Sequence, residues 1–112
     1  MRIEHYSFGK IVISGQTYAK DVIIFPDRVL SPWWRTEGHL LRLGDLTEAL
    51  REMPEVLVSG KGYSGEMDVP DGLVQELEGR GIRVLASNTA EAVGVYNILN
   101  ITKKIAALHL TC

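Results

Sequence analysis

The sequence predicts a three-layer α/β fold around a central mixed sheet, and two observations support this prediction. The first third of the chain has the alternation and the β-branched residues that are typical of antiparallel strands. Residues 56–87 have the pattern of a strand, a helix and a second strand. Because a crossover helix leaves its two strands parallel, the sheet should combine antiparallel N-terminal strands with a parallel strand-helix-strand unit at 56–87.

The antiparallel segments come first in the chain. The alternation and the apolar runs predict a meander of strands at residues 3–8, 11–13 and 22–25. Gly15 supplies a turn within this meander, and Pro26 with Asp27 supplies the next one. A further short strand over residues 29–31 ends at Pro32, because proline has no amide for a sheet hydrogen bond.

From residue 45 the hydrophobic period becomes helical. Asp45 and Glu48 have the spacing of a capping box, and Pro54 stops the helix that they begin. The later elements are predicted in this order: strand 56–58, helix from Pro70 to Gly79, strand 82–86, a helix capped by Asn88 and Glu91, and a last strand over 104–110.

The composition describes a single domain, residues 1–112, without an excess of charge. Twelve Lys and Arg face 14 Asp and Glu, for a net charge of -2. Such a chain has no broad positive field for nucleic acid or for an anionic membrane. The single cysteine, Cys112, and the lack of a signal-like or membrane-spanning apolar run predict a cytoplasmic protein.

No set of residues matches a metal site or a nucleophilic centre. His5, His39 and His109 lack the paired spacing of zinc ligands. Ser64 lacks the final glycine of a G-x-S-x-G motif. The sequence therefore predicts no metal, no cofactor and no catalytic residue.

The first candidate site is the run Gly60–Gly65, which matches G-x-G-x-x-G. It is not a dinucleotide-binding motif, because the next helix starts only at Pro70. If the strands before Gly60 and Asn88 are parallel neighbours, the run lies beside a helix N-terminus, where amides and a lysine can hold an anion. The candidate ligand-binding residues are Gly60, Lys61, Gly62, Asn88 and Thr89. The alternative is structural: the glycines permit a turn and the polar residues cap a helix.

The second candidate site is the segment 31–39, which holds two adjacent tryptophans. On extended backbone Trp33 and Trp34 point to opposite faces, so one can enter the core while the other lines a surface. Arg35 can stack on an indole or bind a carboxylate, and His39 can bind a ligand or titrate near neutral pH. We take Trp34, Arg35 and His39 as candidate ligand-binding residues. The alternative pairs Arg35 with Glu37 and leaves the histidine bonded to a backbone carbonyl.

Several of these motifs, taken in order, resemble the pattern of one protein family. They are Ser-Pro-Trp-Trp-Arg at 31–35 with Gly38 and His39, Asp45-Leu46, the run 58–62, Thr89-Ala90-x-Ala92, and Tyr96-Asn97. The chain resembles the small α/β domains of unknown function that include the adipogenesis-associated domain-containing protein and a mitochondrial complex I assembly factor. The resemblance spans essentially the whole chain and implies a three-layer fold with no established enzymatic activity. Family members often have Gly-Thr-Gly where this chain has Lys61 between two glycines.

Two functions remain open on the sequence. The first is a non-enzymatic binding or assembly module with a protein partner or a second copy of the chain, which the paired tryptophans favour. The second is a small anionic-ligand-binding protein or enzyme with its site between the Gly60–Gly65 loop and the Asn88-Thr89 pair.

Overall fold

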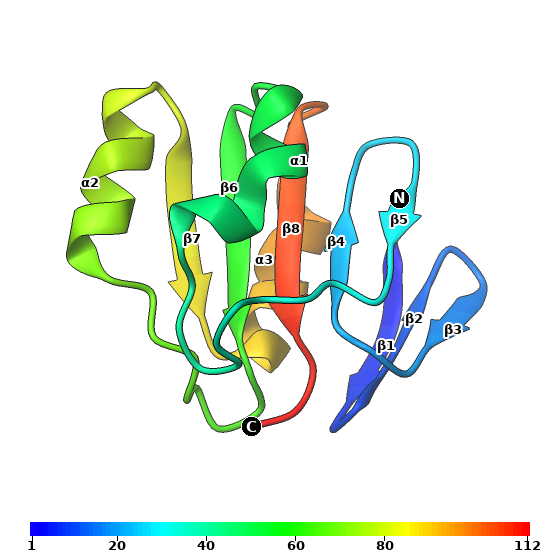
Figure 1. Cartoon of the computed structure of the whole chain (residues 1–112). Coiled ribbons are helices and arrows are strands. Elements are labelled where there is room, and N and C mark those ends of the chain that lie inside the picture. Colours follow the sequence, from blue (N-terminus) through cyan, green and yellow to red (C-terminus); the bar gives the residue numbers. More distant parts are fainter.

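The computed structural model describes residues 1–112 and contains two sheets and three α-helices (Figure 1). The elements in chain order are β1 (Ile3–Ser7), β2 (Lys10–Ile13), β3 (Gln16–Tyr18), β4 (Val22–Ile24), β5 (Val29–Leu30), a 3-10 helix η1 (Leu43–Leu46), α1 (Thr47–Arg51), β6 (Val56–Lys61), α2 (Asp71–Gly79), β7 (Arg83–Ser87), α3 (Thr89–Ile98) and β8 (Lys104–His109). None of the helices has the length and apolar character that crossing a bilayer needs.

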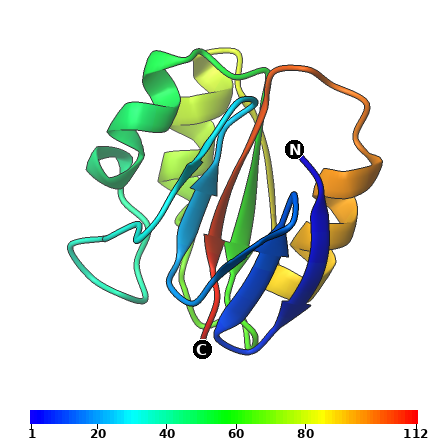
Figure 2. The same cartoon turned by 90° about the vertical axis from the view of Figure 1, so that its right-hand side faces the viewer.

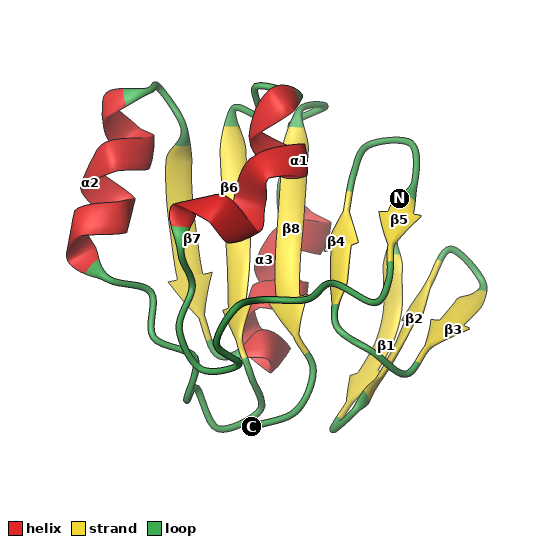
Figure 3. Ribbon diagram, in the orientation of Figure 1, coloured by secondary structure: helices red, strands yellow, loops and turns green.

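The larger sheet has five strands in the order β5-β4-β8-β6-β7 (Figure 3). Strand β6 runs parallel to both β7 and β8, whereas β4 runs antiparallel to β8 and to β5. The predicted mixed sheet is therefore confirmed, and so is the parallel unit at 56–87, in which α2 connects β6 to β7. The other sheet is the antiparallel meander β1-β2-β3.

The five-stranded sheet separates two hydrophobic cores. Leu57 of β6 belongs to the core that α1 and α2 cover, and its neighbour Val58 belongs to the core that α3 and the meander cover. Successive residues of a strand point to opposite faces, so a central strand with both faces covered must be apolar throughout. Figure 2 shows α1 and α2 on one side of the sheet and α3 with the meander on the other. The predicted three-layer fold is confirmed.

Two strands lie where the sequence did not place them. The run 22–25 was predicted within the N-terminal meander, but β4 leaves the meander and pairs with β8, with Val22 opposite Leu108. All three residues of β4 are buried. Burial of successive residues requires packing against both faces of the strand, and the meander does not provide this. Strand β8, the last in sequence, lies at the middle of the sheet between β4 and β6.

The predicted helix caps are wrong in their hydrogen bonding. Asp45 lies inside η1, and its carboxylate accepts hydrogen bonds from the backbone amides of Arg42 at 2.9 Å and Thr36 at 3.2 Å. Asp45 therefore caps the start of η1 through the amide of Arg42 and holds the preceding loop at Thr36, but it is not the N-cap of α1. Asn88 does stand at the N-cap of α3, but its side chain bonds no amide of that helix. Instead it lies against the Gly60–Gly65 loop, where Gly65 leaves room for its oxygen.

Candidate functional site

The two tryptophans point to opposite sides of the chain, as extended backbone predicts. Trp33 is 4% exposed, belongs to the core under α1 and α2, and donates its indole N–H to the Asp45 carbonyl at 3.0 Å. Trp34 is 75% exposed. The backbone between them is fixed, because the amide of Trp33 donates to the carbonyl of Asp21 at 2.9 Å. A buried indole thus anchors the segment that presents an exposed one.

Arg35 folds back into the protein and does not pair with Glu37. Its guanidinium carbon lies 4.5 Å from the centre of the Trp33 ring, and its Nη2 donates to Asp21 Oδ2 at 2.9 Å. The Nε and Nη2 groups also donate to the carbonyl of Gly38. The alternative, in which Arg35 pairs with Glu37, is wrong, because that carboxylate bonds Arg42 at 2.7 Å at the surface.

Asp21 joins Arg35 to the end of the central strand. His109 Nδ1 lies 2.8 Å from Asp21 Oδ2, and the amide of Leu110 donates to Asp21 Oδ1 at 2.7 Å. Arg35 Nη2 also lies 3.0 Å from His109 Nδ1, so the three side chains meet at one point. Burial raises the pKa of Asp21, but the hydrogen bonds from His109, the Leu110 amide and Arg35 together outweigh it and hold that pKa below its ordinary value of 3.8.

His109 connects the two groups of residues that the sequence singled out separately. The His39 ring lies edge-on to the His109 ring, with 5.8 Å between centroids. The His109 carbonyl accepts a hydrogen bond of 2.6 Å from the Thr89 hydroxyl, which in turn accepts the amide of Gly62 at 2.9 Å. Lys61 lies opposite His109 in the register of β6 and β8. The Gly60–Gly65 loop does lie beside the N-terminus of α3, as the parallel strands required.

Several amides of this loop and of the residue after it already have partners within the chain. The amides of Tyr63 and Glu66 donate to the carbonyls of Thr111 and Cys112, and the amide of Gly65 donates back to Gly62. A Cβ atom at Gly60 would approach Thr89 Oγ1 to 2.8 Å, so the hydroxyl fills the place beside the strand end. An anion held by these amides would have to displace bonds that the chain makes to itself.

Gly62 packs directly against the backbone of the C-terminal segment. Its φ is +103°, and an added Cβ would overlap the backbone carbonyl of Cys112. We expect Gly62→Ala to lower the free energy of unfolding by roughly 3 kcal/mol, through strain at positive φ and through displacement of the C-terminal segment. Gly81 is the matched control, because its φ is +83° and no atom lies near its Cβ position. Gly81→Ala should cost about 1 kcal/mol in the same urea titration; equal losses for both variants would contradict the steric part of this account.

Sequence reasoning missed Asp21, Lys20 and the contacts of the His109 side chain. Asp21 and His109 are separated by 88 positions, and no local spacing connects them. Beside them the surface forms a hollow of about 250 Å³, whose lining includes Lys20, Trp34, Arg35, Pro32 and Thr111. Asn88 and His39 do not line it. The structure thus brings Trp34 and Arg35 together at one cavity, and leaves the loop residues in a packed neighbouring region.

Three buried polar side-chain atoms have no hydrogen-bond partner: Arg35 Nη1, His109 Nε2 and Ser59 Oγ. Two of the three belong to the cluster around Asp21. The polar groups of this cluster are therefore not all paired within the chain.

Fold and site together define a small three-layer α/β domain with a buried Arg-Asp-His cluster at the C-terminal end of its central strand. The chain belongs to the family described as "Protein of unknown function (DUF498/DUF598)", whose model matches residues 3–110.

Solved structures share the fold over nearly the whole chain. A conserved hypothetical protein, PH1505 from Pyrococcus horikoshii OT3, is 25% identical with a TM-score of 0.81, and the match covers 100% of both chains. A protein from Bartonella henselae, described as an outer membrane protein, is 22% identical with a TM-score of 0.79 over 98% of this chain and 94% of that one. A Bordetella pertussis protein, described as a Mth938-like domain, is 21% identical with a TM-score of 0.67 over 97% of this chain and 85% of that one.

Proposed function

We propose that this chain is a non-enzymatic binding or assembly module whose contact surface is centred on Trp34. The observation that supports it is an indole 75% exposed on backbone that is held on both sides. Its neighbour Trp33 is anchored in the core, and Arg35 is fixed by Asp21 and Gly38. Tryptophan is enriched among the residues that contribute most to protein interfaces, and a backbone that is already fixed loses little entropy on binding.

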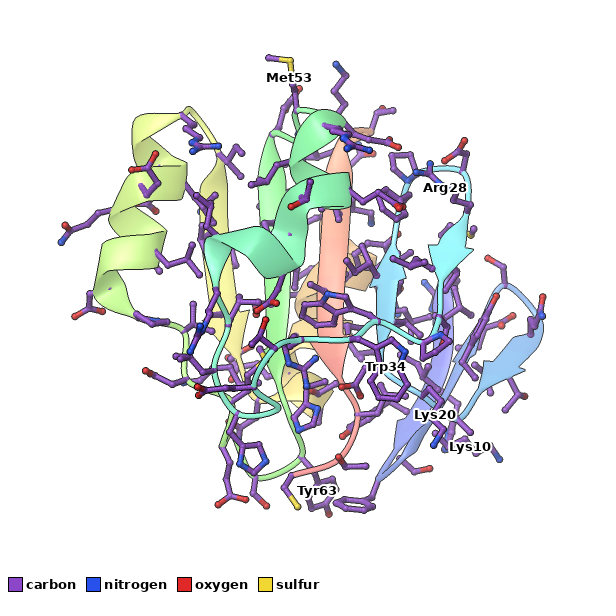
Figure 4. All side chains as sticks on the ribbon, viewed as in Figure 1. Lys10, Lys20, Arg28, Trp34, Met53 and Tyr63 are labelled. Atoms are coloured by element: carbon purple, nitrogen blue, oxygen red, sulfur yellow. The ribbon has the colours of Figure 1, made fainter.

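Photo-crosslinking tests this proposal with a matched control. The photoreactive amino acid p-benzoylphenylalanine replaces Trp34 in one variant and Met53 in another, because both side chains are 75% exposed. Figure 4 shows Met53 at the top of the molecule and Trp34 well below it. In cells that normally make the protein, position 34 should give one dominant adduct, with another protein or with a second copy of the chain, and position 53 should not. Equal adducts at both positions, or none at position 34, would contradict the proposal.

Two further assignments, of kinship and of location, are also proposals. Kinship with the adipogenesis-associated domain-containing protein and the mitochondrial complex I assembly factor rests on the order of the sequence motifs alone. A cytoplasmic location rests on the single cysteine, Cys112, which is exposed and free.

A further inference from the structure

The exposed tryptophan, tyrosine and phenylalanine side chains of the protein surround one short segment, residues 110–111. They are Trp34, Tyr63 and Phe8, which are 75%, 57% and 55% exposed. Both residues of the segment line the hollow beside Trp34. The amide of Tyr63 donates to the Thr111 carbonyl at 2.7 Å, and the amide of Gly9, next to Phe8, donates to the Leu110 carbonyl at 2.9 Å. The three side chains therefore belong to one surface, at the end of β8.

Phe8 and Tyr63 pack against each other across two parts of the fold. Their ring centroids are 5.8 Å apart and their planes meet at 71°, the edge-to-face arrangement that aromatic pairs favour. Phe8 lies at the turn between β1 and β2, and Tyr63 follows β6, so the pair joins the meander to a loop of the main sheet. Single exposed apolar side chains are normal on a protein surface, whereas several that are gathered in one place mark an interaction site.

Three lysines border this aromatic surface: Lys10, Lys20 and Lys61. Lys20 lines the hollow beside Trp34, and the other two stand two residues along the chain from Phe8 and from Tyr63. None of the three lysines makes an ion pair with another residue of the protein. Figure 4 shows Lys10 and Lys20 with Trp34 in the lower right of the view, and Tyr63 at its lower edge.

The acidic residues at the segment oppose these lysines only in part. The Asp21 carboxylate is already engaged by Arg35 and by the amide of Leu110. Glu66, whose amide donates to the Cys112 carbonyl at 3.1 Å, is exposed and makes no ion pair. The lysines therefore outnumber the free carboxylate, and the surface is complementary to an anionic partner. A second copy of the same surface would bring lysines against lysines, which disfavours a two-fold contact here.

We propose that this surface binds an acidic protein segment that carries aromatic side chains. Its carboxylates pair with Lys10, Lys20 and Lys61, and its rings pack on the three exposed aromatic side chains. The inference rests on the proposed function, because Trp34 is the centre of that contact surface, and it adds the chemistry of the partner. A net charge of -2 on the chain disfavours nucleic acid, which requires a broader positive field.

Photo-crosslinking at a second position tests how far the surface extends. In the cells used for position 34, p-benzoylphenylalanine in place of Tyr63 should give the same adduct as it does in place of Trp34. Ile98 is the control position, because it is 80% exposed and lies on α3, away from the segment. An adduct at position 34 without one at position 63 would overturn this inference and leave the proposed function intact. The same adduct at position 98 would also overturn it.

Defined peptides test the chemistry of the partner by fluorescence anisotropy. The probe is a fluorescein-labelled peptide of five Glu-Glu-Tyr repeats, and we expect saturable binding with a dissociation constant below about 200 µM at low ionic strength. Peptides of five Glu-Glu-Ser and of five Lys-Lys-Tyr repeats, which lack the rings or reverse the charge, should bind at least about fivefold more weakly. Equal binding of either peptide, tighter binding of an oligothymidylate of similar length, or no saturation of the probe by about 1 mM would each overturn the proposal.

Matched variants tie this binding to the surface. Lys10→Met and Tyr63→Ser should each raise the dissociation constant of the Glu-Glu-Tyr peptide about threefold, because one removes an ion pair and the other an aromatic contact. Lys103→Met and Ile98→Ser are the controls, since they remove an exposed lysine and an exposed apolar side chain elsewhere. The controls should change the constant by less than about 1.5-fold. Equal effects of the variants and their controls would contradict the proposed surface.

Discussion

Replacing Asp21 by asparagine is expected to lower the free energy of unfolding by roughly 3 kcal/mol, the cost of removing one partner of a buried ion pair. The Arg35 guanidinium would stay buried without its counter-charge. An asparagine oxygen could still accept the Leu110 amide, but its NH₂ group would then face His109 Nδ1 and the donor Arg35 Nη2. Urea titration at pH 7, followed by circular dichroism, measures the loss.

Asp27→Asn is the control for this variant. Asp27 also pairs with an arginine, Arg28 at 3.0 Å, but its side chain is 74% exposed. Exposed pairs contribute little, so we expect a change below about 0.5 kcal/mol. If Asp21→Asn lowered the free energy of unfolding no more than Asp27→Asn does, the cluster would not be what holds the N-terminal half of the chain to β8.

The same carboxylate makes stability depend on pH in a definite direction. Because the pKa of Asp21 is lower in the folded protein than its ordinary value of 3.8, its contribution is fully present above that value. It is lost as the pH falls through the folded-state pKa. The difference in unfolding free energy between the natural protein and Asp21→Asn should therefore be constant from pH 7 to about pH 5 and narrow below about pH 4. A difference that widened on acidification would contradict the direction of this pKa shift.

The sequence predicted the parts of the fold that depend on local pattern. Strands 56–61 and 83–87 were predictable because short apolar runs flank a helix of suitable length, and a crossover of that kind makes them parallel. The position of β4 was not predictable in this way. Three apolar residues in a row are compatible with an edge of the meander or with the main sheet, and only the pairing with β8 across the chain decides between them.

In the candidate site, the opposite orientation of the two tryptophans was predictable, because it depends on the backbone alone. Alternation along extended backbone predicted that one of Trp33 and Trp34 is buried and the other exposed, and the structure shows that Trp33 is the buried one. A carboxylate partner for Arg35 was predicted, but its identity was not: the nearby Glu37, which the alternative named, bonds Arg42, and the partner in space is Asp21. Contacts between residues that are far apart in sequence leave no periodic signal in a single chain. Long-range pairing therefore determines the cluster that joins the two candidate sites.

The two adjacent tryptophans should respond to truncation in opposite ways. Trp33→Ala is expected to lower the free energy of unfolding by about 3–5 kcal/mol, in the range for removal of a large buried aromatic side chain. The core under α1 and α2 would lose a member, Arg35 would lose the ring it stacks on, and the Asp45 carbonyl would lose its donor. Trp34→Ala should change stability by less than about 0.5 kcal/mol, because its indole is 75% exposed.

Trp33→Phe keeps this comparison informative if the alanine variant does not fold. Phenylalanine retains an aromatic ring beneath Arg35 but cannot donate to the Asp45 carbonyl, so its loss should be near 1–2 kcal/mol, the cost of a buried acceptor left unpaired. Thermal unfolding followed by circular dichroism measures all three variants without relying on tryptophan emission. If Trp34→Ala were as destabilising as Trp33→Phe, the exposed indole would be part of the folded core. It could then not be the free centre of a binding surface, and the proposed function would lose its support.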